Sequence, residues 1–252
     1  RHRHHGWIRE RGGWLSRIPG YTLLAGGHSF PPAAFDMTSQ NRAAGWGILA
    51  GIALISAATL AVQVLQTRLF SVMLWHHLTY MVVTVTLLGF GAGGSLLALF
   101  PGIGRAHDDP RVSVSTCCSL FGITLIGAFA ILTHTPLDTL DVDANRSQYF
   151  FLFLHYAYLV IPFLFAGMAI AIALQQFGKS VHKTYFFNLI GSGVGAFLFL
   201  LLVRDFGGPG CLFLFASLGG LAGWVSLSGS SEHSAWPSRL LALVAVAIWP
   251  LS

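Results

Sequence analysis

The histidines at positions 76 and 77 are the residues of this chain that most resemble a ligand set. His76 and His77 lie beside Trp75 and Tyr80, and two neighbouring imidazoles could bind a metal ion or a haem. Adjacent residues on a helix point about 100° apart, so two such side chains rarely bind one ion. An aromatic and polar belt at a membrane surface is the simpler interpretation of this group.

The N-terminal histidines and the cysteines do not suggest a better metal site. The run RHRHH at residues 1–5 could chelate a metal, but it precedes any segment with the pattern of a folded domain. Cys117 and Cys118 are adjacent, which fits neither a disulfide framework nor the spacing of a metal site. The sequence therefore predicts no metal site, no cofactor site and no catalytic residue in this chain.

Two glycine clusters have the spacing that helices use to pack closely. Gly89 and Gly93 lie in LLGFGAGGSLL, and Gly191 and Gly195 lie in NLIGSGVGAF. Small residues four apart share one face of a helix and let a second backbone approach in lipid. The run GSGVG could also suggest a nucleotide-binding loop, but no strand precedes it and no charge interrupts its surroundings. We therefore predict that these four glycines lie at helix crossings.

The composition places these residues in a membrane protein. Of 252 residues, 54% are hydrophobic and only 9% are charged, whereas a soluble domain has about 25% charged residues. This deficit excludes an ordinary water-soluble enzyme, a disordered chain and a nucleic-acid binder. The net charge of +5 does not change this conclusion, because five of the fourteen Lys and Arg residues lie in the first 17 positions.

The intervals between charged residues predict the membrane spans. A bilayer core of about 30 Å needs roughly 20 apolar helical residues, and a charge at its centre is costly. Backbone polar groups cannot be satisfied by lipid, so the spans must be helices. We predict an all-α, polytopic transmembrane helical bundle with six full spans and a truncated seventh, near 46–65, 78–100, 114–133, 149–174, 185–203, 208–228 and 239–252.

The segments outside these spans give the predicted domain organisation. We expect residues 1–36 to be a non-native or disordered leader, since they lack a secretory pattern and Met37 precedes the first span as a natural start would. Residues 37–252 are then the transmembrane domain, which we expect to be incomplete because its last span is short. Residues 66–77 are predicted to form a short interfacial helix, and Pro162 is predicted to kink the fourth span.

Positive charges in the short loops predict the orientation. The N-terminal side and the even-numbered loops hold six Lys or Arg residues after position 36, and the opposite side holds three: Arg68, Arg146 and Arg204. Loops rich in Lys and Arg stay in the cytoplasm, so the N-terminus is predicted to be cytoplasmic. The three aspartates of residues 134–148 fit the outer face.

Few polar residues remain as candidates for function. No predicted span contains an acidic residue, which is unusual for an ion-coupled carrier. Our polar candidates are Arg68, His76, Asn188 and Asp205. An interfacial ion pair with the adjacent Arg204 is the alternative for Asp205, and an exposed pair of this kind contributes only about 0–1 kcal/mol.

Several stretches resemble the membrane region of spermidine synthase-like integral membrane proteins. The segment AVQVLQTRLFSVMLWHHLTYMVVTVTLLGFGAGG is similar to the opening of that family, with its Arg-Leu-Phe-Ser segment, Trp/His patch and Gly-rich second span. TYFFNLIGSGVGAF resembles a family helix through Tyr185, Asn188, Leu189, Gly191, Ser192 and Gly195. RDFGGPG resembles a family turn through Asp205, Gly207, Gly208 and Pro209. The resemblance covers about residues 60–252.

The resemblance implies a longer protein in which the membrane region and the catalytic domain are separate. Members of this family usually carry, after the membrane region, a Rossmann-like domain similar to aminopropyltransferases and S-adenosylmethionine-dependent methyltransferases. No catalytic or cofactor residue of that domain can be assigned in this chain. The family often has a Glu after the first span, where this chain has Gln63 and Gln66.

Three functions are compatible with these patterns. The first is a membrane region that anchors a C-terminal catalytic domain and exchanges substrate with it. The second is a transporter resembling half of a major-facilitator carrier, and the third is a structural subunit of a larger membrane complex. The implied partners are the lipid bilayer and the C-terminal domain of the same chain. A prokaryotic inner membrane is implied by the resemblance.

Overall fold

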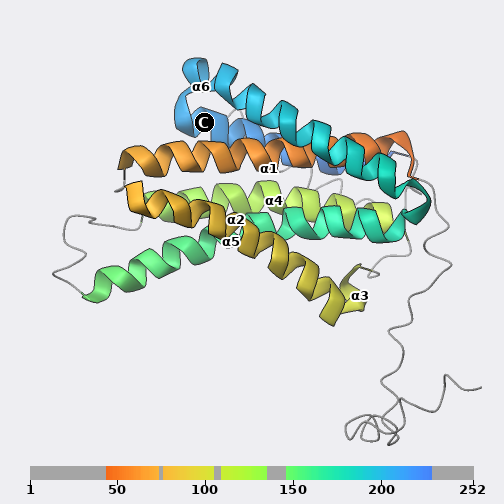
Figure 1. Ribbon diagram of the computed structural model, residues 1–252, viewed down its shortest axis with the longest axis horizontal. Coiled ribbons are helices and arrows are strands. Elements are labelled where there is room, and N and C mark those ends of the chain that lie inside the picture. Colours follow the sequence, from red (N-terminus) through yellow and green to blue (C-terminus); the bar gives the residue numbers. More distant parts are fainter. Residues whose placement is uncertain (1–43, 74–75, 105–108, 135–145, 229–252) are drawn as a thin grey trace, which may run out of the picture. The chain divides into compact units, whose positions relative to one another are not determined.

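The computed structural model describes residues 44–73, 76–104, 109–134 and 146–228, and the regular elements in these ranges are all helical. They are α1 (Trp46–Met73), α2 (His76–Leu99), the single turn α3 (Pro101–Gly104), α4 (Pro110–His134), α5 (Arg146–Gln176), the 3-10 helix η3 (Gly178–Ser180) and α6 (Val181–Ser226) (Figure 1). Within these ranges, five helices are long and apolar enough to cross a membrane: α1, α2, α4, α5 and α6. The predicted leader 1–36 and the predicted seventh span 239–252 lie outside the described residues.

The first helix is longer than the sequence pattern predicts. α1 runs without a break from Trp46 to Met73, so residues 66–73 continue the first span, and the prediction of a separate interfacial helix over 66–77 is wrong. No glycine or proline lies between Gly51 and Met73 to end the helix. Its 28 residues extend over about 42 Å, which exceeds a bilayer core of about 30 Å.

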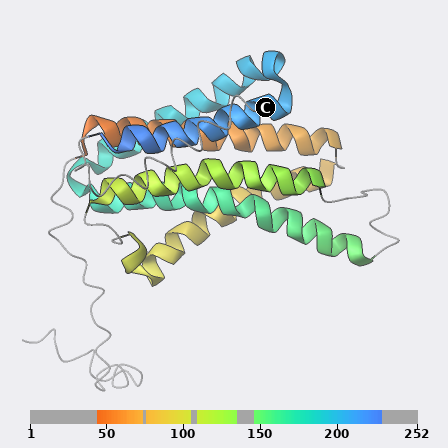
Figure 2. The ribbon, with the colours of Figure 1, turned by 180° about the vertical axis from the view of Figure 1, so that it is seen from behind.

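The last helix, α6, is a hairpin of two helical segments. Gly207 interrupts it with φ 65° and ψ −176°, a conformation that glycine adopts without strain, and Pro209 follows. In the first segment, Gly191 lies against Ala53 and Gly195 against Ala57, so this segment runs parallel to α1. The second segment contacts α1 in the opposite order along the length of that helix. The chain therefore turns back within α6, as Figures 1 and 2 both show.

Contacts along α1 fix the direction of the remaining helices. Ala222 and Ser226 of the second α6 segment lie against Gly51, so this segment is antiparallel to α1. α5 is also antiparallel to α1, because Phe70 near the end of α1 stacks on Tyr156 near the start of α5, with ring centroids 6.4 Å apart.

The glycines of α2 and α6 show how the outer helices are paired. Gly89 lies against Phe163 and Gly93 against Met168, so α2 and α5 run in the same direction. Gly219 lies against Cys118 and Gly223 against Ser115, so α4 is antiparallel to the second α6 segment. Pro162 lies within α5, and both ribbon views show α5 changing direction along its length.

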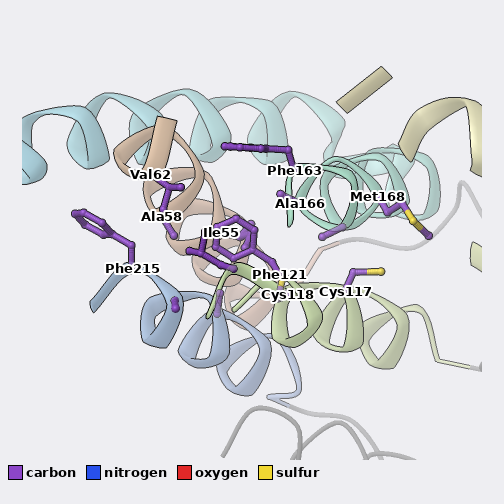
Figure 3. Packing of buried hydrophobic residues seen from close by; sticks show 14 of the residues in the cluster. Ile55, Ala58, Val62, Cys117, Cys118, Phe121, Phe163, Ala166, Met168 and Phe215 are labelled. Carbon is purple, nitrogen blue, oxygen red and sulfur yellow. The ribbon is translucent and has the colours of Figure 1, made fainter. Parts of the chain in front are cut away.

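One large apolar core joins the long helices in the part of the chain that the structure describes. This core includes Ile55, Ala58 and Val62 of α1, Phe121 of α4 and Phe215 of α6, together with Phe163, Ala166 and Met168 of α5 (Figure 3). The outward faces of α2 and α6 are apolar too: Leu87 is 66% exposed and Phe197 is 65% exposed. Exposed apolar faces of this extent suit contact with lipid and not with water.

Candidate functional site

The interface between α1 and the first segment of α6 depends on the absence of side chains at two glycines. A Cβ atom at Gly191 would overlap the carbonyl oxygen of Ala53, and one at Gly195 would overlap the carbonyl oxygen of Ala57. Both glycines are buried. The two backbones therefore approach as closely as the small-residue spacing allows in lipid.

The interface between α2 and α5 is built in the same way. A Cβ atom at Gly89 would lie 2.6 Å from Cβ of Phe163, and one at Gly93 would lie 2.6 Å from the carbonyl oxygen of Leu164. In contrast, a Cβ atom at Gly91 or Gly193 would meet nothing within 4 Å. The structure thus places Gly89, Gly93, Gly191 and Gly195 against a second helix, while their neighbours in the same clusters face outward.

Among the polar candidates whose side chains the structure describes, Asn188 is the one that lies inside a helix interface. Its Oδ1 lies 2.6 Å from Oγ of Ser56, and Ser56 Oγ also donates to the carbonyl oxygen of Ile52 at 2.6 Å. A hydroxyl has one hydrogen and cannot donate to both oxygens at once, so the pair is best satisfied when the amide group of Asn188 donates to Ser56. Ser56 is 2% exposed, so this contact joins α1 and α6 in a dry environment.

Arg68 and Asp205 do not lie beside Asn188. Arg68 and Asp205 are both exposed, and both lie at the end of the bundle where α6 reverses beside Leu69. Ser56, the partner of Asn188, precedes Arg68 by twelve residues of α1, or about 18 Å of helix. His76 begins α2, and its side chain lies outside the described ones. The four candidates therefore do not form a single site.

Gln66 of α1 is a buried polar residue that the sequence analysis did not select. It is 3% exposed, and its Oε1 has no hydrogen-bond partner among the described residues. Gln66 and Phe70 are four apart and share a face of α1, and Phe70 stacks on Tyr156 of α5. A buried amide oxygen without a donor is costly, so this point could accept a hydrogen bond from water or from the N–H group of a bound molecule.

The departure from the pattern of the family that the sequence resembles was the signal that could have identified Gln66. The sequence offers Gln63 and Gln66 in place of an expected Glu, and its pattern places Gln63, not Gln66, among the polar residues within the spans. Gln63 is partly buried, whereas Gln66 is almost fully enclosed. Gln63 and Gln66 are three residues apart on α1. The rotation of α1 about its axis decides which of them faces the interior, and the neighbouring helices set this rotation.

Acid–base and metal chemistry have few candidates in the described part of the chain. No group of three or more His, Cys, Asp and Glu side chains is placed to hold a metal ion among the described residues. Comparison of the chain with protein-family models, with curated proteins and with solved structures gives no match. The features that remain are the glycine crossings, the Ser56–Asn188 contact and the buried oxygen of Gln66.

Proposed function

We propose that this chain is the membrane-embedded region of a spermidine synthase-like protein. In this proposal it anchors a C-terminal S-adenosylmethionine- or polyamine-type domain to a prokaryotic inner membrane. The chain would cross the membrane six times within residues 46–228, with the two segments of α6 counted separately, and its N-terminus would be cytoplasmic. The transmembrane bundle would act as a scaffold.

The observation that carries the proposal is the place of the family-like motifs in the fold. Asn188, Gly191 and Gly195 lie on the side of α6 that packs on α1. Gly207, Gly208 and Pro209 lie at the reversal between its two segments. Residues of these motifs pack against α1 or form the reversal of α6. Such positions favour a structural role for this region. The chemistry that the resemblance implies would then belong to the C-terminal domain.

The complete reading frame provides the test. We would read the gene past Ser252, express the whole protein in its membrane and measure binding of intact and decarboxylated S-adenosylmethionine by calorimetry. A following βαβ segment with a Gly-rich loop, together with binding of either molecule, would support the proposal. A stop codon, only further apolar spans, or a complete domain that binds neither molecule would refute the enzymatic part.

The buried oxygen of Gln66 favours a second role in the same region, the passage of a solute through the bundle. Polyamines and similar amines carry N–H donors for an amide oxygen and charges that interact with aromatic faces such as those of Phe70 and Tyr156. Uptake of labelled spermidine into proteoliposomes should then fall in the Gln66→Leu variant. The Gln63→Leu variant is the matched control. Absence of uptake by the unmodified protein would eliminate this role.

A further inference from the structure

The connection between α5 and α6 presents three basic side chains on one exposed face. Lys179 of η3 and His182 and Lys183 in the first turn of α6 are all exposed, and they lie within five residues of one another around the buried Ser180. Trp46, which is 79% exposed, lies at the same end of the bundle and meets Phe187 edge to face at 6.2 Å. Charged and aromatic side chains of this kind typically lie at the level of lipid head groups.

Hydrogen bonds hold the backbone of this basic face in place. The backbone N–H of Ala44 donates to Oγ of Ser180 at 3.1 Å, which ties the start of α1 to the residue between Lys179 and α6. The N–H of Ser180 donates to the carbonyl oxygen of Phe177 at 2.9 Å, and Ser180 itself is buried. The basic side chains therefore project from a fixed turn.

The same face of α6 continues into the membrane as an apolar surface. Phe186, Ile190 and Phe197 are 57%, 47% and 65% exposed. Gly193 lies among them without a side chain and with no atom near its Cβ position. It is ten residues beyond Lys183, or about 15 Å of helix, which is half the thickness of a bilayer core of about 30 Å.

We propose that this face binds an anionic phospholipid of one leaflet. Lys179 and Lys183, with His182, hold the phosphate group, and one acyl chain lies along Phe186 and Ile190 toward Gly193. Positive charge attracts anionic head groups, and a basic site beside transmembrane helices can select them over neutral ones. The distance from Lys183 to Gly193 matches the depth that one acyl chain of one leaflet spans. The inference rests on the membrane assignment and is independent of the enzymatic resemblance.

A charge-matched pair of variants provides the test. The whole chain is reconstituted in nanodiscs, and exchange of phosphatidylglycerol and phosphatidylcholine at its surface is measured by native mass spectrometry. The test variant is K179Q/K183Q. The control variant is R68Q/R204Q, which removes two exposed arginines from the opposite end of the bundle. Melting temperatures in phosphatidylcholine identify any variant that has lost its fold, and the single variants K179Q and K183Q then replace the double one.

We expect the unmodified protein and R68Q/R204Q to prefer phosphatidylglycerol, and K179Q/K183Q to lose roughly 10- to 30-fold of that preference. Equal losses in the two double variants, or no preference in the unmodified protein, would overturn the proposal. Inorganic phosphate separates head-group binding from binding of a lipid. If phosphate at millimolar concentration displaces the lipid completely, the site binds free anions and the acyl-chain part of the proposal is wrong.

Discussion

At the scale of single residues, the roles of the glycines differ within each cluster. Gly191 and Gly195 lie against backbone carbonyl groups of α1, whereas Gly193 between them has open space at its Cβ position. A run of small residues therefore contains both packing positions and positions without steric demand. Stability measurements on neighbouring glycines can separate the two kinds.

The Gly191→Leu variant should be clearly less stable than the unmodified protein. The added side chain would have to displace Ala53 of α1, and overpacking of this kind costs about 1–3 kcal/mol or more. A thermal-shift assay in detergent measures the loss as a lower melting temperature. Gly193→Leu is the matched control and should melt near the unmodified protein. Equal melting of both variants would contradict the close contact of α1 and α6.

The contact between Ser56 and Asn188 should contribute a measurable coupling energy. Hydrogen bonds between helices in membranes contribute about 0.6 kcal/mol on average and up to about 2 kcal/mol. A double-mutant cycle with Ser56→Ala and Asn188→Leu, measured by unfolding in detergent, should give a coupling of about 0.5–1.5 kcal/mol. Thr59→Ala with Asn188→Leu serves as the control cycle, since Thr59 bonds to Ile55 within α1. A coupling of zero in the first cycle would show that the contact does not stabilise the fold.

At the scale of elements, α6 is defined by its reversal. The first segment runs with α1 and the second runs against it, and the change takes place at Gly207 beside Pro209. Both segments pack on α1. For this reason α1 has a partner on two sides and is the most enclosed of the candidate spans. The turn at Gly207 is therefore a condition for the whole arrangement.

The Gly207→Ala variant should destabilise this hairpin. At φ 65° and ψ −176° a Cβ atom is strained whatever the space around it, with a cost of about 1–3 kcal/mol. The melting temperature in detergent should fall accordingly. Gly94→Ala in α2 is the control, because nothing lies within 4 Å of its Cβ position and alanine favours a helix. An unchanged melting temperature for Gly207→Ala would argue against the backbone conformation at this turn.

At the scale of the whole molecule, the direction of the helices determines which loops share a side of the membrane. Lys179, His182 and Lys183 lie with the start of α1, and Asp205 lies with its end. The proposed six crossings therefore place these groups on opposite sides. Lys and Arg favour the cytoplasm, so the basic group should be inside.

Cysteine labelling in sealed membrane vesicles tests this arrangement. His182→Cys and Asp205→Cys should react with a membrane-impermeant maleimide from opposite sides, and Lys183→Cys should behave like His182→Cys. The three native cysteines are buried and can be replaced by serine or alanine where they give background labelling. Labelling of positions 182 and 205 from one side would contradict a crossing by the first segment of α6.

The amino-acid sequence by itself determined the class of the fold. Long charge-free intervals leave no alternative to helices in lipid, since lipid cannot satisfy backbone polar groups. The intervals located the centres of α1, α2, α4, α5 and both segments of α6. They could not locate the ends of the helices, because apolar composition does not reveal where a helix leaves the membrane. For this reason the sequence predicted a separate helix from residue 66 on, although α1 continues through residues 66–73.

Only the tertiary structure decided which helices meet and which residues lie between them. The spacing of Gly89, Gly93, Gly191 and Gly195 predicts a packing face but not the partner, because many helices could present a smooth surface to a glycine. The partners are α5 for the first pair and α1 for the second. The burial of Gln66, whose oxygen has no donor among the described residues, depends likewise on the rotation of α1 among its neighbours. Periodicity is a property of one helix, whereas contact depends on the packing of two.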